Sequence, residues 1–227
     1  MLTDVTGYIA LDQSRNLTVL AFRGSHTWKN WLANFDAGLV PTDICEDCNA
    51  WHGFWLAWLE ARDEIKSTFR RIAAQQPQNR AIVVGHSLGG AIADLAAADL
   101  RNGGIPTDLY TYGAPRIGGQ PISDYITNTP AQKGSTYRVT HSDDPVPRVP
   151  PQNWGFYDIG PEYWISAGNG VQVTAKDITK SSGANMNTEG DPGDLSLLSV
   201  IGLDVDAHLW YFGPMDSANE KNDVSSG

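Results

Sequence analysis

The chain has 227 residues, of which 41 % are hydrophobic and 19 % charged, a composition typical of a globular protein with an apolar core. Acidic residues outnumber basic ones by 26 to 16, so the formal net charge is −10. Such a surface repels phosphate backbones, which argues against a nucleic-acid partner. No stretch approaches the roughly 18 consecutive apolar residues of a membrane-spanning helix, so we expect no integral membrane segment.

The first residues predict a β-hairpin. Residues 1–12 contain neither the basic nor the apolar region of a signal peptide. Two apolar, β-rich runs at 6–11 and 17–23 are separated by a polar turn. An Asn-Leu-Thr sequence at 16–18 matches the acceptor pattern for N-linked glycosylation, which agrees with a secreted protein.

The two cysteines, Cys45 and Cys48, form a single CxxC pair. A zinc site requires further ligands, and the sequence has no second CxxC and no HxxH. A thioredoxin-like redox motif requires a preceding strand, whereas residues 42–44 have the pattern of a loop. We expect a small disulfide that staples a loop, with redox chemistry or free thiols as alternatives. A disulfide indicates an oxidising compartment.

Helices and strands alternate through the middle of the chain. Apolar residues recur near every 3.6 positions from Phe54 to Ala74, which predicts an amphipathic helix that ends before Pro77. The elements expected next are a buried strand at 80–85, an Ala-rich helix at 88–101, a strand at 108–112, a helix at about 119–127 and a strand at 136–141. This alternation predicts parallel strands, right-handed crossovers and a single α/β domain over residues 1–227.

The last third of the chain is rich in Pro and Gly. Its pattern predicts a short hairpin around 155–173 and a polar surface loop at 181–194. We expect a frayed polar tail at about 214–227.

A serine motif lies between the buried strand and the Ala-rich helix. Residues 85–89 are Gly-His-Ser-Leu-Gly, a match to G-x-S-x-G in the strand-to-helix setting of a nucleophile elbow. Ser87 would occupy a strained turn, so its neighbours two positions away must be small. The following helix would direct its positive end at the site. The alternative is an ordinary turn with a capping serine.

A serine nucleophile requires a base, and the chain has five histidines. His86 is adjacent to Ser87, so we expect its side chain to point away and to pack. The order Ser, acid, His of α/β-hydrolases favours His208 as the base, with His141 second. Asp143 or Asp144, just past a predicted strand, would orient the imidazole, and spacing does not choose between them.

From Gly7 to Phe212 the chain resembles the filamentous-fungal class 3 lipases. The segments behind the likeness are 22–25 (FRGS), 85–90 (GHSLGG), 112–116 (YGAPR), 141–148 (HSDDPVPR), 161–164 (PEYW) and 208–212 (HLWYF). The resemblance implies an α/β-hydrolase fold with a mainly parallel central sheet and flanking helices. The family pattern also includes an N-terminal helical segment and a disulfide between the termini, which this sequence lacks, so we expect an N-terminally truncated member.

The resemblance implies roles for particular residues. The triad would be Ser87, Asp144 and His208, because the family's acid directly precedes the x-Val-Pro-Arg segment. Ser25 and Leu88 would donate backbone hydrogen bonds to the oxyanion. No metal or cofactor is implied.

The resemblance also suggests a lid at residues 25–35. The apolar positions of this segment have helical spacing and are Trp28, Trp31, Leu32 and Phe35. Taken alone, that spacing predicts a short helix packed in the core. Placed directly after the oxyanion serine, it resembles the family's amphipathic lid, which covers the serine in water and exposes its aromatic face at a lipid surface.

These features predict a secreted serine ester hydrolase that cleaves tri- or diacylglycerols at lipid–water interfaces through an acyl-enzyme on Ser87. The expected partners are the ester substrate and, peripherally, a lipid surface. One alternative is a feruloyl-type esterase of the same fold, although those enzymes tend to have Thr at the position of Ser25 and a more polar lid. The other is a catalytically inert, truncated lipid-binding homologue, which would not react with an alkyl phosphonate at Ser87.

Overall fold

A computed structural model describes residues 6–24, 38–182 and 206–215 of the chain. Its central feature is a seven-stranded sheet with the order β1-β2-β5-β6-β7-β8-β9. The strands are β1 (Gly7–Asp12), β2 (Leu17–Phe22), β5 (Arg80–His86), β6 (Thr107–Tyr112), β7 (Thr136–His141), β8 (Glu162–Ile165) and β9 (Ile178–Ser181). The inner strands run parallel, whereas β1 and β9 pair antiparallel at the two edges. The predicted mainly parallel sheet is confirmed.

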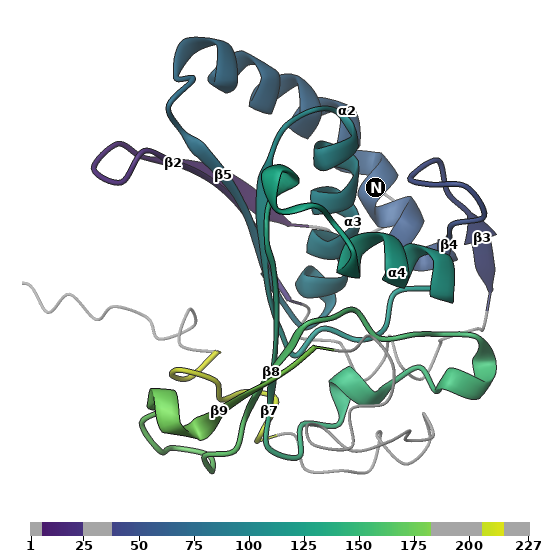
Figure 1. Cartoon of the computed structure of the whole chain (residues 1–227), viewed down its shortest axis with the longest axis vertical. Helices are drawn as coiled ribbons and strands as arrows, with labels where there is room; N and C mark the ends of the chain where they lie inside the picture. The colour runs from purple at the N-terminus through teal and green to yellow at the C-terminus, as the bar shows by residue number, and fades with distance from the viewer. Residues whose placement is uncertain (1–5, 25–37, 183–205, 216–227) are drawn as a thin grey trace, which may run out of the picture.

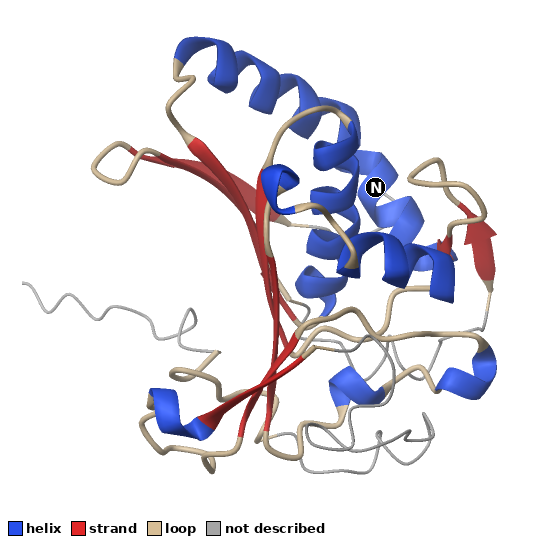
Figure 2. Ribbon diagram, in the orientation of Figure 1, coloured by secondary structure: helices blue, strands red, loops and turns tan. Residues whose placement is uncertain are grey.

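The described α-helices lie on one face of the sheet (Figure 1, Figure 2). They are α2 (His52–Gln75), α3 (Leu88–Asn102) and α4 (Gln120–Thr127). From β2 to β8 the parallel strands follow one another in a single direction, so right-handed crossovers bring each connecting helix to the same side. In this part of the chain, no helix has both the length and the apolar character to cross a bilayer.

Helix α3 packs between the sheet and α2 and is buried along nearly its whole length. Its many alanines allow the helix to approach the strands closely, and all of those from Ala91 to Ala98 are fully buried. Trp58 of α2 is also fully buried, and its indole Nε1–H donates to Asp99 Oδ2 of α3 at 3.0 Å. The core therefore fixes the helix that begins next to Ser87.

The hairpin predicted around 155–173 lies further along the chain, at 162–181, where β8 and β9 pair antiparallel. Strand β8 pairs parallel with β7 on one side and antiparallel with β9 on the other, and the β8–β9 connection spans 166–177. The Pro and Gly residues of this region signal turns but do not identify partners. Because β8 pairs with a strand that precedes it by more than 20 residues, its partner is not visible in the local pattern.

The predicted disulfide between Cys45 and Cys48 is present. It lies in the loop of a small hairpin formed by β3 (Leu39–Pro41) and β4 (Asn49–Trp51), which the sequence did not predict. The Thr42 N–H donates to the Cys48 carbonyl at 2.8 Å across the same loop. The disulfide thus closes a loop that is also held by the main chain.

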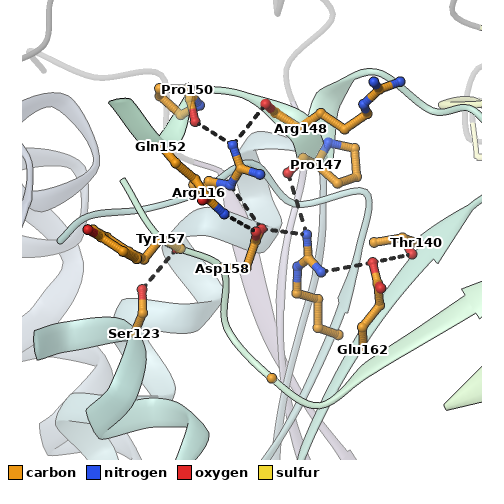
Figure 3. Close-up of polar contacts among 12 residues, drawn as sticks. Arg116, Ser123, Thr140, Pro147, Arg148, Pro150, Gln152, Tyr157, Asp158 and Glu162 are labelled. Atoms are coloured by element: carbon orange, nitrogen blue, oxygen red, sulfur yellow. Dashed lines mark hydrogen bonds and ion pairs between the residues drawn. The ribbon is translucent and has the colours of Figure 1, made fainter. Parts of the chain in front are cut away.

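A buried group of charges fastens the segment after β7 to the sheet (Figure 3). Asp158 Oδ1 accepts hydrogen bonds from Arg116 Nε and Arg138 Nη2, both at 3.0 Å. Arg138 also donates to Glu162 Oε1 of β8 at 3.0 Å. Arg116 extends the network by donating to the carbonyl oxygens of residues 148 and 150. The irregular chain between β7 and β8 is thereby held by several charge-assisted bonds.

Asp158→Ala would leave two buried guanidinium groups without their shared carboxylate. We expect the free energy of unfolding to fall by about 3–5 kcal/mol, measured by chemical denaturation. Asp63→Ala is a matched control, because the Asp63 side chain is 100 % exposed. Its effect should stay within about 0.5 kcal/mol. Equal effects of the two substitutions would contradict a stabilising role for the cluster.

Asp94 is a buried acid in the middle of α3, only 4 % exposed. Burial raises its pKa to about 8, and the positive charges of Arg138 and Arg101 offset part of that rise. The folded protein therefore holds a proton on this carboxyl at neutral pH that the unfolded chain releases.

This difference predicts a pH dependence of stability. Between about pH 4 and pH 8 the folded state binds the proton more tightly than the unfolded state, so Asp94 makes the protein less stable as pH rises. Asp94→Asn removes that contribution, and the variant should gain stability relative to the parent across this window. Denaturant midpoints measured from pH 4 to pH 9 test it, with Asp63→Asn as the exposed control. Parallel curves for parent and Asp94→Asn would overturn the assignment.

Candidate active site

The carboxyl ends of the parallel strands meet at one edge of the sheet, which is where α/β folds place their sites. Gly24 follows β2, Ser87 follows β5, Gly113 follows β6 and Asp144 follows β7. His208 comes from the C-terminal segment 206–215. Residues far apart in the sequence therefore gather at this edge.

Ser87 lies on a strained turn between β5 and α3. Its φ of 56° and ψ of −130° are unusual for a residue with a side chain. Its N–H donates to the Tyr112 carbonyl at 2.9 Å, and its side chain makes no capping hydrogen bond. The strained geometry, without a cap, is that of a nucleophile elbow rather than of a capping serine.

Glycines make this turn possible. A Cβ on Gly85 would lie 2.2 Å from the Gly89 carbonyl oxygen, so neither the turn nor the helix start accepts a side chain at Gly85. A Cβ on Gly24 would lie 3.4 Å from Ser87 Cβ. The end of β2 therefore runs directly beside Ser87.

A buried carboxylate joins two side chains of the C-terminal segment. Asp144 Oδ2 accepts a hydrogen bond from His208 Nδ1 at 2.9 Å and another from Tyr211 Oη at 2.6 Å. Asp144 Oδ1 accepts one from the Val146 N–H at 2.9 Å. All three side chains are at most 1 % exposed. The bond to Asp144 holds the His208 imidazole in one orientation, in which Nε2 points away from the carboxylate.

Gly113 leaves the space in which these groups meet. A Cβ there would lie 2.6 Å from Tyr211 Oη, 2.8 Å from Asp144 Oδ2 and 2.9 Å from His208 Nδ1. The residue also has a φ of +57°, which glycine adopts at no steric cost. Both constraints require glycine in the Tyr-Gly-Ala-Pro-Arg segment.

The hydrogen bonds keep Asp144 ionised. Burial by itself would raise the pKa of this carboxyl. The positive charge and the hydrogen bond of His208, followed by the bonds from Tyr211 and Val146, more than offset burial and lower the pKa below its ordinary value. The carboxylate therefore remains charged without contact with solvent.

His86 is a packed, hydrogen-bonded histidine, as expected from its position next to Ser87. Its ring centroid lies 4.5 Å from that of His208, and its Nε2 lies 2.8 Å from the His208 carbonyl oxygen. Burial, together with the neighbouring His208, lowers its pKa to about 4, so the ring is neutral and donates through Nε2–H. The ring packs against His208 and bonds to its main chain, a partner that the sequence did not identify.

The other candidates are engaged elsewhere or exposed. His141 is fully buried, with Nδ1 2.9 Å from the Ala207 carbonyl oxygen and Nε2 2.8 Å from that of Ala167. Asp143 is exposed and accepts a hydrogen bond from the Ser142 hydroxyl. The structure thus brings His208 to Asp144 and leaves the alternative acid in a surface turn.

Leu88 is the first residue of α3. The first N–H groups of a helix have no acceptor within it, so they are suited to bind an anion. The other predicted oxyanion residue, Ser25, and the predicted lid residues Trp28, Trp31, Leu32 and Phe35 lie outside the described residues. Across 6–24, 38–182 and 206–215, no three His, Cys, Asp or Glu side chains converge as metal ligands would.

Tyr211 is the contact that sequence reasoning missed. It lies three residues after His208, and a turn rather than a helix directs both side chains to the same oxygen. A buried tyrosine hydroxyl requires a polar partner, which is the only signal the sequence offers. Its partner, 67 residues earlier, cannot be found from that signal.

Comparisons with known proteins agree with this geometry. The family model described as Lipase (class 3) matches residues 19–154. Secreted mono- and diacylglycerol lipase A of Penicillium cyclopium is 42 % identical over 220 residues, 95 % of this chain and 68 % of that protein. Secreted mono- and diacylglycerol lipase 1 of Fusarium solani is 40 % identical, covering 94 % of this chain and 61 % of that protein.

Solved structures give the same result for the fold. The mono- and diacylglycerol lipase from Aspergillus oryzae matches with a TM-score of 0.83 at 38 % identity, covering 96 % of this chain and 78 % of that one. The predicted α/β-hydrolase fold is confirmed. The chain spans about two-thirds of the length of the curated relatives quoted above.

Tyr211→Phe tests the second hydrogen bond to the carboxylate. Losing a bond to a buried charge costs about 1.5–3 kcal/mol, so we expect kcat for a soluble ester to fall about tenfold to a hundredfold with little change in KM. Tyr112→Phe is the matched control, because that ring packs 5.9 Å from Tyr211 and its hydroxyl does not bond to Asp144. Equal kcat values for the two variants would show that the hydroxyl does not position the site.

Proposed function

The chain belongs to the class 3 lipase family and is a carboxylic ester hydrolase, and we propose that it cleaves acylglycerols through an acyl-enzyme on Ser87. The observation that supports this most directly is the buried Asp144–His208 hydrogen bond beside a strained serine turn. Nucleophilic acyl transfer of this kind requires a serine that attacks, a histidine that removes its proton and an acid that orients the histidine.

In the proposed reaction His208 Nε2 removes the proton from Ser87 Oγ as this oxygen bonds to the ester carbonyl carbon. The tetrahedral intermediate collapses when His208 returns the proton to the departing alkoxide, which leaves as the alcohol product, a lower glyceride or glycerol. Water, deprotonated by the same imidazole, then attacks the acyl carbon. The second intermediate collapses as the bond to Ser87 Oγ breaks and His208 returns the proton to that oxygen, which releases the fatty acid and restores the serine. No metal or organic cofactor takes part in these steps.

The main-chain amides of Leu88 and Ser25 are proposed to donate to the oxyanion. The Leu88 N–H is the first of α3, and Gly24 brings the end of β2 beside Ser87. Removal of one such donor typically costs about 10²–10³ in kcat. Asp144 stabilises the imidazolium that forms in each step, because its charge is already present and oriented.

Relatives named mono- and diacylglycerol lipases support an acylglycerol substrate. Because 40–42 % identity extends over most of the chain, we propose that partial glycerides are accepted along with any triacylglycerol. Residues 25–35 are proposed to act as an amphipathic lid that opens at a lipid surface. Secretion is proposed from the same relatives, whose names describe them as secreted.

Hydrolysis rate against tributyrin concentration, taken through its solubility limit, tests the proposal on folded protein. A sharp rise when droplets form supports a lipase with a lid. Smooth saturation below the limit supports an esterase with an open site, including the feruloyl type. Comparison of mono-, di- and tributyrin at equal interface area gives the glyceride preference.

Ser87→Ala is the decisive variant. Loss of a triad nucleophile lowers kcat by about 10⁶-fold, so turnover should fall to background. An alkyl phosphonate should label the parent at Ser87 and leave Ser87→Ala unlabelled. Undiminished hydrolysis by Ser87→Ala would contradict the mechanism, and a folded parent that neither turns over nor reacts would favour an inert lipid-binding protein.

A further inference from the structure

We propose that Asn16 is a site of N-linked glycosylation and that its glycan shields the neighbouring edge of the sheet. Residues 16–18, Asn-Leu-Thr, are the sole Asn-x-Ser/Thr sequence among the 227 residues. The proposal rests on the secretion proposed above, because N-linked glycans are added to proteins that enter the secretory pathway.

The turn between β1 and β2 presents Asn16 to solvent. The residue is exposed and has a φ of 54°, a left-handed conformation that asparagine tolerates. The side-chain hydrogen bonds of the turn involve other residues. Asp12 accepts from the Ser14 hydroxyl at 2.6 Å and from the Arg15 guanidinium at 2.8 Å. The Asn16 carbonyl oxygen accepts from the Arg80 N–H at 2.8 Å. None of these bonds uses the Asn16 side-chain amide.

The order of synthesis gives the glycosylating enzyme access to the acceptor sequence. In the folded protein Thr18 is 3 % exposed, and its hydroxyl accepts from Asn79 Nδ2 at 3.2 Å, so the threonine of the acceptor sequence is hidden although Asn16 is exposed. Strand β2 pairs with β5, which begins at residue 80. At about 5–20 residues per second the ribosome adds β5 several seconds after Thr18. Glycan transfer therefore precedes burial of the threonine.

A glycan at Asn16 would not obstruct the ester site. Asn16 lies at the amino end of β2, and the carboxyl end of that strand leads to Gly24 beside Ser87. Six residues of strand at about 3.3 Å each separate the two ends by about 20 Å. The turn also projects beyond the helices and the rest of the sheet (Figure 1).

The edge next to this turn is apolar. In the described part of the chain β1 pairs with β2 alone, and it exposes Tyr8 by 65 % and Leu11 by 43 %. An edge strand with apolar side chains is a template for pairing with a second copy unless a charged or bulky group blocks it. A hydrated glycan at the end of the hairpin supplies such a group.

The test is secretion of the full 227-residue chain from yeast behind a host leader, with protein collected from the medium and from the membrane fraction. Peptide N-glycosidase should remove the mass of one glycan and leave Asp at position 16, as read by peptide mass spectrometry. Asn16→Gly should show no mass loss, and its backbone suits the positive φ. Thr18→Ser retains the acceptor pattern and should behave as the parent does. An unmodified Asn16 in both fractions overturns the site.

The shielding role has its own readout. Light scattering at equal concentration should show faster aggregation of Asn16→Gly than of the glycosylated parent, while the initial rate of ester hydrolysis stays unchanged. Equal aggregation overturns the shielding role. A secreted, active parent without a glycan would refute this inference alone, whereas a glycosylated parent without turnover would refute the proposed ester hydrolysis alone.

Discussion

The site depends on a carboxylate that water does not reach. Asp144 is fully buried, and an ionised carboxyl in that position is unstable unless hydrogen bonds replace its hydration. Those bonds come from Val146, two residues after it, and from His208 and Tyr211, more than 60 residues later. The charge is already present in the unfolded chain, so it can be buried at low cost only when the C-terminal segment supplies these donors.

The backbone around the carboxylate is equally constrained. A side chain at Gly24 would contact Ser87, and one at Gly85 would overlap the start of α3. A side chain at Gly113 would overlap the polar groups that meet at the Asp144 carboxylate. The strand ends can converge because these positions have no Cβ. On the far side, the buried ion cluster around Asp158 holds the irregular chain that leaves Asp144. The reactive groups are thus fixed from both directions, which preorganises them for the proposed chemistry.

Features that depend on neighbouring residues could be predicted from the sequence, whereas contacts between distant residues could not. The strand, turn and helix around Ser87 were predictable because apolar periodicity and the flanking glycines lie within a few residues. The partner of β8 was not, since strand pairing depends on residues distant in the chain. The same distance hid the bond from Tyr211 to Asp144. The partner of His86 was hidden for the same reason, because His208 lies 122 residues later.

The groups around His208 would stabilise the imidazolium that the proposed reaction forms there. Asp144, whose pKa is lowered, lies on one side of the ring and accepts its Nδ1–H. His86 lies 4.5 Å away on another side, but burial holds its pKa at about 4, so it remains neutral above that pH and does not repel a charge on His208. Below about pH 4, protonated His86 would place a like charge against an imidazolium at His208, whereas the lowered pKa of Asp144 opposes its protonation. Burial therefore has different outcomes at the two neighbours. It lowers the pKa of His86, whose ring nitrogen bonds to a carbonyl oxygen, and keeps that ring neutral. At Asp144 three hydrogen-bond donors and the charge of His208 outweigh burial, and the pKa falls.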